Sequence, residues 1–199
     1  MSEVLICNRA LQLLGDDPII ALTDNSKRAR AMNLAYAPVR DAELRRRRWK
    51  FSIARAQLPA NATAPLSDYA NAFPLPTDWL RLIGGADLGS YPDLADFSAT
   101  RNALYSLEGR QVLTNLPAPL SIRYIRQVTD TSMFDAAFAE ALCARLAYEC
   151  CEQITQSDSK QKLAMARYKQ AISEALRANA LESATESIAD DSWIAARLG

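Results

Sequence analysis

Two consecutive helical patterns, covering residues 134–181, constrain the fold of this chain more than any other feature of its sequence. In the first pattern, apolar residues recur every three or four positions, which places them on one face of an α-helix. These residues are Phe134, Phe138, Ala141, Leu142, Leu146, Cys150 and Ile154. A helix with such a face must bury it against other elements, so the pattern predicts a helix inside a larger core.

The second pattern follows a polar break at residues 155–159. Its apolar stripe consists of Ala164, Tyr168, Ala171, Ile172 and Ala175. A short polar connection predicts that the two helices are antiparallel neighbours. Because neither helix can hide its stripe alone, other parts of the chain have to complete the core.

The start of the chain predicts two further helices. Ser2 is a good N-cap and Gly15 stands where a helix ends in a left-handed residue, so a short first helix is expected between them. Residues 23–26 offer several caps for a longer second helix. Pro38 lies inside the second pattern and predicts a kink or an interruption there.

The middle of the chain has β-type patterns. Trp49, Phe51 and Ile53 alternate with polar residues, which predicts a short half-buried strand. Gly109 lies between apolar runs and predicts a hairpin turn, and residues 120–125 alternate as a further strand.

Taken in order, these patterns predict a mainly α protein of the α+β class. Residues 1–48 and 130–181 are expected to form a four-helix core, with Asp130 or Ser132 capping the third helix. Residues 49–129 are expected to form a small antiparallel β insertion between the second and third helices, and residues 182–199 an extended C-terminal tail.

Composition excludes several classes of chemistry. The chain has no histidine, which removes the commonest general base and the commonest metal ligand. Its 23 basic and 23 acidic residues cancel, so no global field attracts nucleic acid or acidic membranes. The four cysteines lie in helical patterns without a C-x-x-C pair, which indicates buried reduced thiols. No stretch approaches the roughly 20 apolar residues that a membrane span needs.

The basic run at the end of the second helical pattern is the strongest local signal. It consists of Arg45, Arg46, Arg47, Arg48 and Lys50. Residues 27–50 hold nine basic and two acidic residues, a local charge of +7. The run is either a contact surface for phosphates or carboxylates, or a solvated helix end. Four consecutive arginines point in four directions around a helix, so contacts with another protein subunit are favoured over sequence-specific DNA recognition.

No catalytic, cofactor-binding or metal-binding residue is predicted. Asp87, Asp93 and Asp96 lie in a segment with no helix or strand to fix their separation, so they are interpreted as solvated loop acids. Gly84 and Gly85 are not followed by a phosphate-loop pattern.

The last residues combine an acidic front half with an apolar end. Trp193 and Ile194 would be the apolar anchors of this end, and Arg197 its polar clamp. A flexible spacer before such a cluster is typical of a segment that folds onto a partner. Docking back onto the chain's own core remains an equal alternative.

Several short motifs, in their order and spacing along almost the whole chain, resemble one known family. The motifs are ALQLLG at 10–15, WKF at 49–51, FPLPTDWLR at 73–81, EG at 108–109, YI at 124–125 with VTD at 128–130, FD at 134–135 with Phe138, and SW at 192–193 with Arg197. The series resembles the tail tubular protein A family of short-tailed bacteriophages, the head-to-tail adaptors.

The resemblance implies a mostly helical structural protein of the virion with a β insertion. It implies a ring of twelve copies between the portal protein and the tail nozzle protein, with viral double-stranded DNA passing through the lumen without sequence recognition. It also implies assembly in the host cytoplasm and no catalysis. Under this expectation, residues 45–48, Lys50, Trp193, Ile194 and Arg197 would contact the portal or a neighbouring copy.

Two other classes of function stay open. A helical DNA-binding or packaging accessory protein would use residues 45–48 on phosphates and bind duplex DNA with a steep salt dependence. An enzyme would need an acid/base system from Asp, Glu, Lys, Tyr or Cys, and no set of these residues converges in the sequence.

Overall fold

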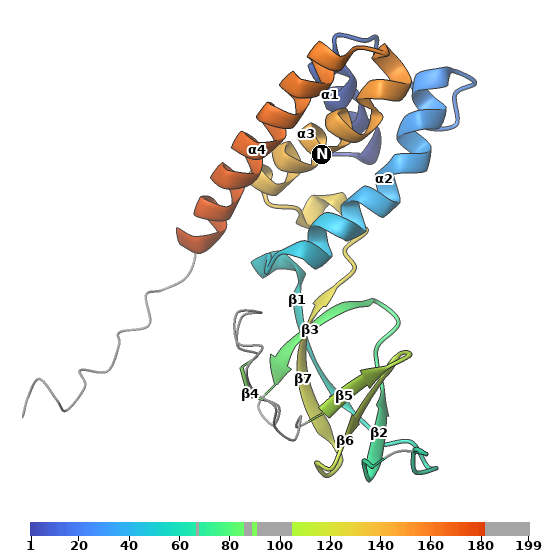
Figure 1. The fold of residues 1–199 in the computed structure, drawn as a ribbon, viewed down its shortest axis with the longest axis vertical. Coiled ribbons are helices and arrows are strands. Elements are labelled where there is room, and N and C mark those ends of the chain that lie inside the picture. The colour runs from blue at the N-terminus through green and yellow to red at the C-terminus, as the bar shows by residue number, and fades with distance from the viewer. Residues whose placement is uncertain (67, 86–88, 91–104, 182–199) are drawn as a thin grey trace, which may run out of the picture.

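The computed structural model describes residues 1–66, 68–85, 89–90 and 105–181. Within these ranges the helices gather at one end of the molecule and the strands at the other (Figure 1). The strands follow the second helix and precede the third. The predicted α+β class, with an antiparallel β insertion between two helical pairs, is confirmed. The predicted tail, residues 182–199, lies outside the described residues.

Helix α1 spans Glu3–Leu14 and has both predicted ends. The Ser2 hydroxyl accepts a hydrogen bond from the Leu5 amide at 3.2 Å. Gly15 adopts the left-handed conformation, with φ of 68°, which glycine reaches without steric cost. Local hydrogen bonds and backbone freedom therefore determine the length of this helix.

Helix α2 spans Lys27–Arg46 and is capped by Ser26. It continues through Pro38, so the interruption that the sequence offered as one outcome does not occur. A proline at position 38 cannot donate to the carbonyl of Leu34. Because Leu34 and Pro38 are both exposed, water can satisfy that carbonyl, and the helix tolerates the missing hydrogen bond.

Helix α3 spans Ala136–Thr155, and its N-cap is Asp135 rather than Asp130 or Ser132. One carboxylate oxygen of Asp135 accepts hydrogen bonds from the amides of Ala137 and Phe138, at 2.8 and 3.1 Å. Asp130 instead caps the single 3-10 turn η2, Thr131–Met133. The sequence prediction was wrong because two aspartates five positions apart both start a helical turn, and only the second turn continues.

Helix α4 spans Asp158–Leu181 and follows α3 after a break at Gln156, which is left-handed with φ of 50°. Helix α3 packs against α1, α2 and α4 and is the central helix of this core. The four helices, α1 to α4, are called the helical core below. Its buried side chains on α3 include Phe138, Leu142, Leu146 and Cys150, all members of the predicted stripe.

The predicted strand at residues 49–53 is displaced. Residues Lys50–Ser52 form a 3-10 turn, η1, and strand β1 begins only at Ile53. The rings of Trp49 and Phe51 lie 4.9 and 5.0 Å from the ring of Phe138, measured between centroids. Both side chains thus point into the helical core, because burying two large aromatic rings there is worth more than two further strand residues.

The remaining strands form two antiparallel sheets, called together the β insertion. The first has the order β1-β7-β3-β4, with β1 at Ile53–Leu58, β7 at Leu120–Arg126, β3 at Trp79–Gly85 and β4 at Gly89–Ser90. The second has the order β2-β6-β5, with β2 at Asn71–Pro74, β6 at Gln111–Thr114 and β5 at Tyr105–Glu108. Gly109, with φ of 58°, makes the predicted hairpin between β5 and β6.

The β insertion has its own small core between the two sheets. Its buried residues include Phe73 and Val112 from the second sheet and Leu120, Ile122 and Tyr124 from the first. The upper part of the first sheet joins the helical core instead, through Ile83 and Ile125. In the described part of the chain, no helix has the length and apolar character that a membrane span requires.

Candidate interaction surface

The predicted basic run lies where the helical core meets the β insertion, at the end of α2 and before β1 (Figure 1). The Arg45 guanidinium donates a hydrogen bond to the carbonyl of Leu80 in β3. Its central carbon also lies 5.9 Å from the ring centroid of Trp79, which favours a cation–π interaction. Arg45 therefore ties α2 to the first sheet.

Arg46 is also engaged within the chain. Its guanidinium donates to the Tyr168 hydroxyl at 3.2 Å and lies 3.6 Å from the Glu43 carboxylate. Arg47 and Arg48 differ, because their side chains are exposed and form no hydrogen bond or ion pair with any described residue. Of the four arginines, the structure leaves Arg47 and Arg48 available for another molecule.

Lys50, the last residue of the predicted run, is one of two residues whose backbone is hydrogen-bonded to the side chain of Asn179 in α4. The Lys50 amide donates to the Asn179 side-chain oxygen at 3.0 Å, and the Asn179 side-chain amide donates to the Arg48 carbonyl at 3.1 Å. This pair of hydrogen bonds fixes the last turns of α4 beside the basic run. The sequence did not predict it, because a single asparagine on a helix gives no sign of its partner.

Trp193, Ile194 and Arg197, the other predicted contact residues, lie outside the described residues. Helix α4 ends at Leu181, and Asn179 in its last turn donates to the Arg48 carbonyl, so the end of α4 lies beside the basic run.

Glu43 is a buried charged group that the sequence interpretation missed. Its side chain is 4% exposed. One carboxylate oxygen accepts a hydrogen bond from the Tyr168 hydroxyl at 2.8 Å and lies 3.9 Å from Arg145 of α3. Glu43 thus joins α2, α3 and α4. Its burial could have been predicted from its position, because Glu43 shares one helix face with the apolar residues Tyr36 and Val39.

The environment of Glu43 changes the acidity of Tyr168. Burial raises the pKa of the Tyr168 hydroxyl, and the hydrogen bond to Glu43 raises it further. The tyrosine therefore stays neutral and acts as a donor. This cluster has the character of a structural contact between helices rather than of an acid/base pair, because the buried Glu43 carboxylate is already engaged by Tyr168, Arg46 and Arg145.

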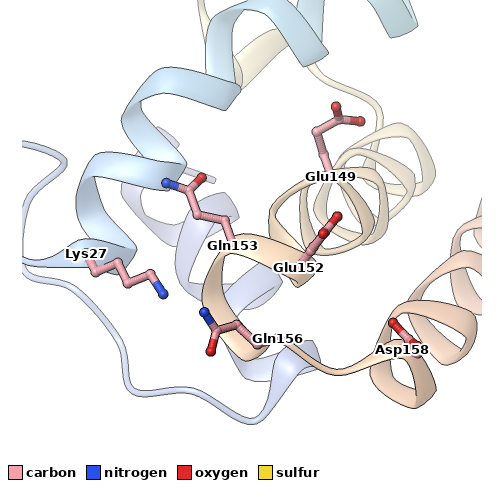
Figure 2. A pocket seen from close by; sticks show the side chains of 6 residues that line it. All are labelled: Lys27, Glu149, Glu152, Gln153, Gln156 and Asp158. Carbon is pink, nitrogen blue, oxygen red and sulfur yellow. The ribbon is translucent and has the colours of Figure 1, made fainter.

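A polar groove of about 680 Å³ lies at the opposite end of the helical core. Figure 2 shows its lining: Lys27 from the start of α2, Glu152 and Gln153 from the end of α3, Gln156 from the connection and Asp158 from the start of α4. Glu149, at its edge, already pairs with Arg145 at 3.0 Å. The lining has no apolar anchor of the kind that small-molecule sites use, so the groove does not constitute a ligand site.

The described residues contain no group of three acidic or cysteine side chains arranged to hold a metal ion. The four cysteines are free and buried, as predicted. Burial raises the pKa of Cys7 and of Cys143 to about 12, and that of Cys150 to about 11. Buried thiols with such values stay protonated at neutral pH and are poor nucleophiles.

These thiols predict a loss of stability at alkaline pH. The unfolded chain loses each thiol proton near pH 9.0, whereas the folded chain keeps it to about 12 at Cys7 and Cys143. The folded state then binds more protons, so the free energy of unfolding falls as pH rises through this window, by about 1.4 kcal/mol per pH unit for each thiol. Urea denaturation between pH 8 and 11 measures this slope, and Cys143→Ala should reduce it. An unchanged slope in Cys143→Ala would contradict the assignment.

No protein-family model matches this chain, and comparison with curated proteins finds no match either.

Proposed function

We propose that this protein is a structural adaptor of a short-tailed bacteriophage virion, forming a ring between the portal protein and the tail nozzle protein. One observation carries the proposal: the motifs of the resemblance coincide with the positions that shape this fold. Gly15 ends α1, Trp49 and Phe51 join the helical core, Gly109 makes the hairpin, and Asp135 starts α3. Residues with such structural roles are the ones that a shared fold requires.

The junction between the two parts of the molecule gives further support. Arg45 binds the Leu80 carbonyl, and the side chain of Gln127 donates to the Asp41 carboxylate at 2.6 Å. These contacts hold the β insertion in a fixed orientation below α2. A ring subunit needs this rigidity, because a closed ring repeats the same contact around an axis.

The test is assembly with the portal protein of the same phage. We expect the pure protein to sediment as a folded monomer at micromolar concentration and to form a ring only when portal rings are added. Electron microscopy of the mixture would then show an additional ring at one end of each portal ring. A stable ring formed without portal would contradict the expected monomer, and no association with portal would contradict the adaptor function.

The exposed pair Arg47 and Arg48 allows a more specific prediction. Arg47→Ala with Arg48→Ala should impair assembly on the portal without lowering the thermal midpoint, since neither side chain has a partner among the described residues. The matched control is Lys169→Ala with Arg177→Ala, which removes two exposed charges from α4. Equal assembly by the two double variants would exclude the pair as a contact.

A DNA-binding or packaging accessory protein is the second candidate, and the exposure of Arg47 and Arg48 is the observation in its favour. The engagement of Arg45 and Arg46 within the chain counts against it, because only half of the run remains free for phosphates. If the Arg47 and Arg48 variant assembles normally but binds duplex DNA less tightly, this second candidate is favoured.

A further inference from the structure

The first sheet of the β insertion carries a one-sided set of charges. Strands β1, β3 and β7 contain the charged residues Arg55, Arg81, Arg123 and Arg126, and none of their residues is acidic. The whole protein has no net charge, so such a segregated set is not a consequence of composition. No sequence pattern reveals this set, because the arginines are separated by up to 71 positions and only the strand pairing brings them together.

The register places three of these arginines on one face. Arg55 of β1 lies directly opposite Arg123 of β7. Arg81 of β3 lies opposite Ile125, two positions along β7 from Arg123 and therefore on the same side of the sheet. The other side, with Leu82, Ile122 and Tyr124, faces the small core between the sheets. The basic face therefore points away from that core.

The pairing of Arg55 with Arg123 is electrostatically unfavourable, and no described residue compensates for it. Like charges directly opposite each other in an antiparallel pair are destabilising. Neither Arg55 nor Arg123 forms an ion pair or hydrogen bond through its side chain with any described residue, and the Arg123 Nε atom is buried without an acceptor. An anion placed between the two guanidinium groups would remove both the repulsion and the missing hydrogen bond.

The neighbouring residues indicate the kind of anion. The next pair on the same face is Gln57 opposite Ser121, and Ile53 opposite Ile125 at the other end is covered by the helical core. Beyond the part that the helical core covers, the described residues of this face in β1 and β7 are arginine, glutamine and serine, and none is a large apolar residue. Hot spots of protein interfaces combine arginine with buried tryptophan and tyrosine, which this part of the face lacks, whereas contacts with nucleic-acid phosphates use arginine with polar side chains.

We propose that this face of the first sheet, with Arg55 and Arg123 at its centre, binds the phosphate backbone of duplex DNA. The choice of duplex DNA rests on the proposed adaptor function, in which DNA passes through the ring. Binding is independent of base sequence, because guanidinium groups on a flat sheet reach phosphates and no element enters a groove. The face would then be directed toward the lumen of the ring.

The test compares three double variants of the full-length protein: Arg55→Gln with Arg123→Gln, Arg47→Gln with Arg48→Gln, and the control Lys169→Gln with Arg177→Gln. Fluorescence anisotropy of a labelled duplex of about 30 base pairs, titrated from about 20 to 200 mM salt, gives the affinity and its salt dependence. Loss of two phosphate contacts should reduce the slope of log K against log salt by about 1.8. We expect this change, with at least tenfold weaker binding at low salt, only for the Arg55 and Arg123 variant.

The folding control is the thermal midpoint of the Arg55 and Arg123 variant, which should not fall, because the substitution removes a like-charge pair. Unchanged affinity and slope in this variant would overturn the proposal. An equal loss in the control, or a loss confined to the Arg47 and Arg48 variant, would overturn it as well.

Assembly on portal rings, measured on the same Arg55 and Arg123 variant, separates the two proposals. Retained assembly together with lost DNA binding supports both. If the wild-type protein binds DNA through this face but never associates with portal, the adaptor function fails and the DNA-binding face stands.

Discussion

Trp49→Ala is expected to lower the free energy of unfolding by about 4 kcal/mol, the largest single effect in the molecule. Trp49 is fully buried, and its ring packs edge-on against Phe138 at 4.9 Å and stacks on Phe51 at 6.4 Å. Its indole N–H donates to the Glu43 carbonyl at 3.0 Å. The substitution therefore removes a large apolar volume and leaves a buried carbonyl without its donor.

Urea denaturation measures this effect, with the slope of the transition showing whether the unfolded state has changed. Trp49→Phe is the matched control, because it keeps an aromatic ring in place and loses the hydrogen bond and part of the volume. It should cost clearly less than the alanine variant. If Trp49→Ala loses less than about 1.5 kcal/mol, the site collapses around the cavity and Trp49 is not the centre of the aromatic cluster.

Glu43→Ala is expected to cost about 3 kcal/mol, because removing one partner of a buried charged cluster leaves the others unpaired. The Glu43 carboxylate accepts from Tyr168 at 2.8 Å and lies within 3.9 Å of both Arg46 and Arg145. Loss of the carboxylate would leave the buried Tyr168 hydroxyl without its acceptor. The contact between α2 and α4 should weaken first, because Tyr168 of α4 donates its hydrogen bond to Glu43 of α2.

Three further variants test the mechanism of this loss. Glu149→Ala is the control, since Glu149 also pairs with Arg145 but is 46% exposed, and an exposed ion pair contributes at most about 1 kcal/mol. Tyr168→Phe removes only the hydroxyl, and the double variant with Glu43→Ala gives the coupling between the two groups. Hydrogen exchange of α4 amides should rise in Glu43→Ala. Additive losses in the double variant would show that the hydrogen bond adds nothing to stability.

Most helix ends could be predicted from local sequence. Ser2, Ser26 and Gly15 act at α1 and α2 as the sequence predicts, because a cap is decided by hydrogen bonds within a few residues. Gly109 makes its hairpin for the same reason. The start of α3 could not be predicted in this way, because Asp130 offers an equally good local cap. The helix continues after Asp135 because Phe138 is buried there.

The contacts of the side chains in the basic run could not be predicted from local sequence. Its position at the end of α2 and its charge are evident from the sequence, but the four side chains have different fates. Arg45 meets a carbonyl of β3 and Arg46 meets Tyr168 of α4, 122 positions away, so distant elements determine which arginines remain free. The pairing of Arg55 with Arg123 depends in the same way on the register of β1 with β7.

Local patterns predicted the four helices, the hairpin at Gly109, the strand at residues 120–125 and most of the buried stripes, because periodicity and caps are properties of short segments. The tertiary structure alone decided that Trp49 and Phe51 leave the strand pattern for the helical core, that Glu43 is buried, and which face of the sheet is basic. Each of these depends on contacts between residues far apart in the chain, where the free energy of burying a large side chain or a charge exceeds any local preference.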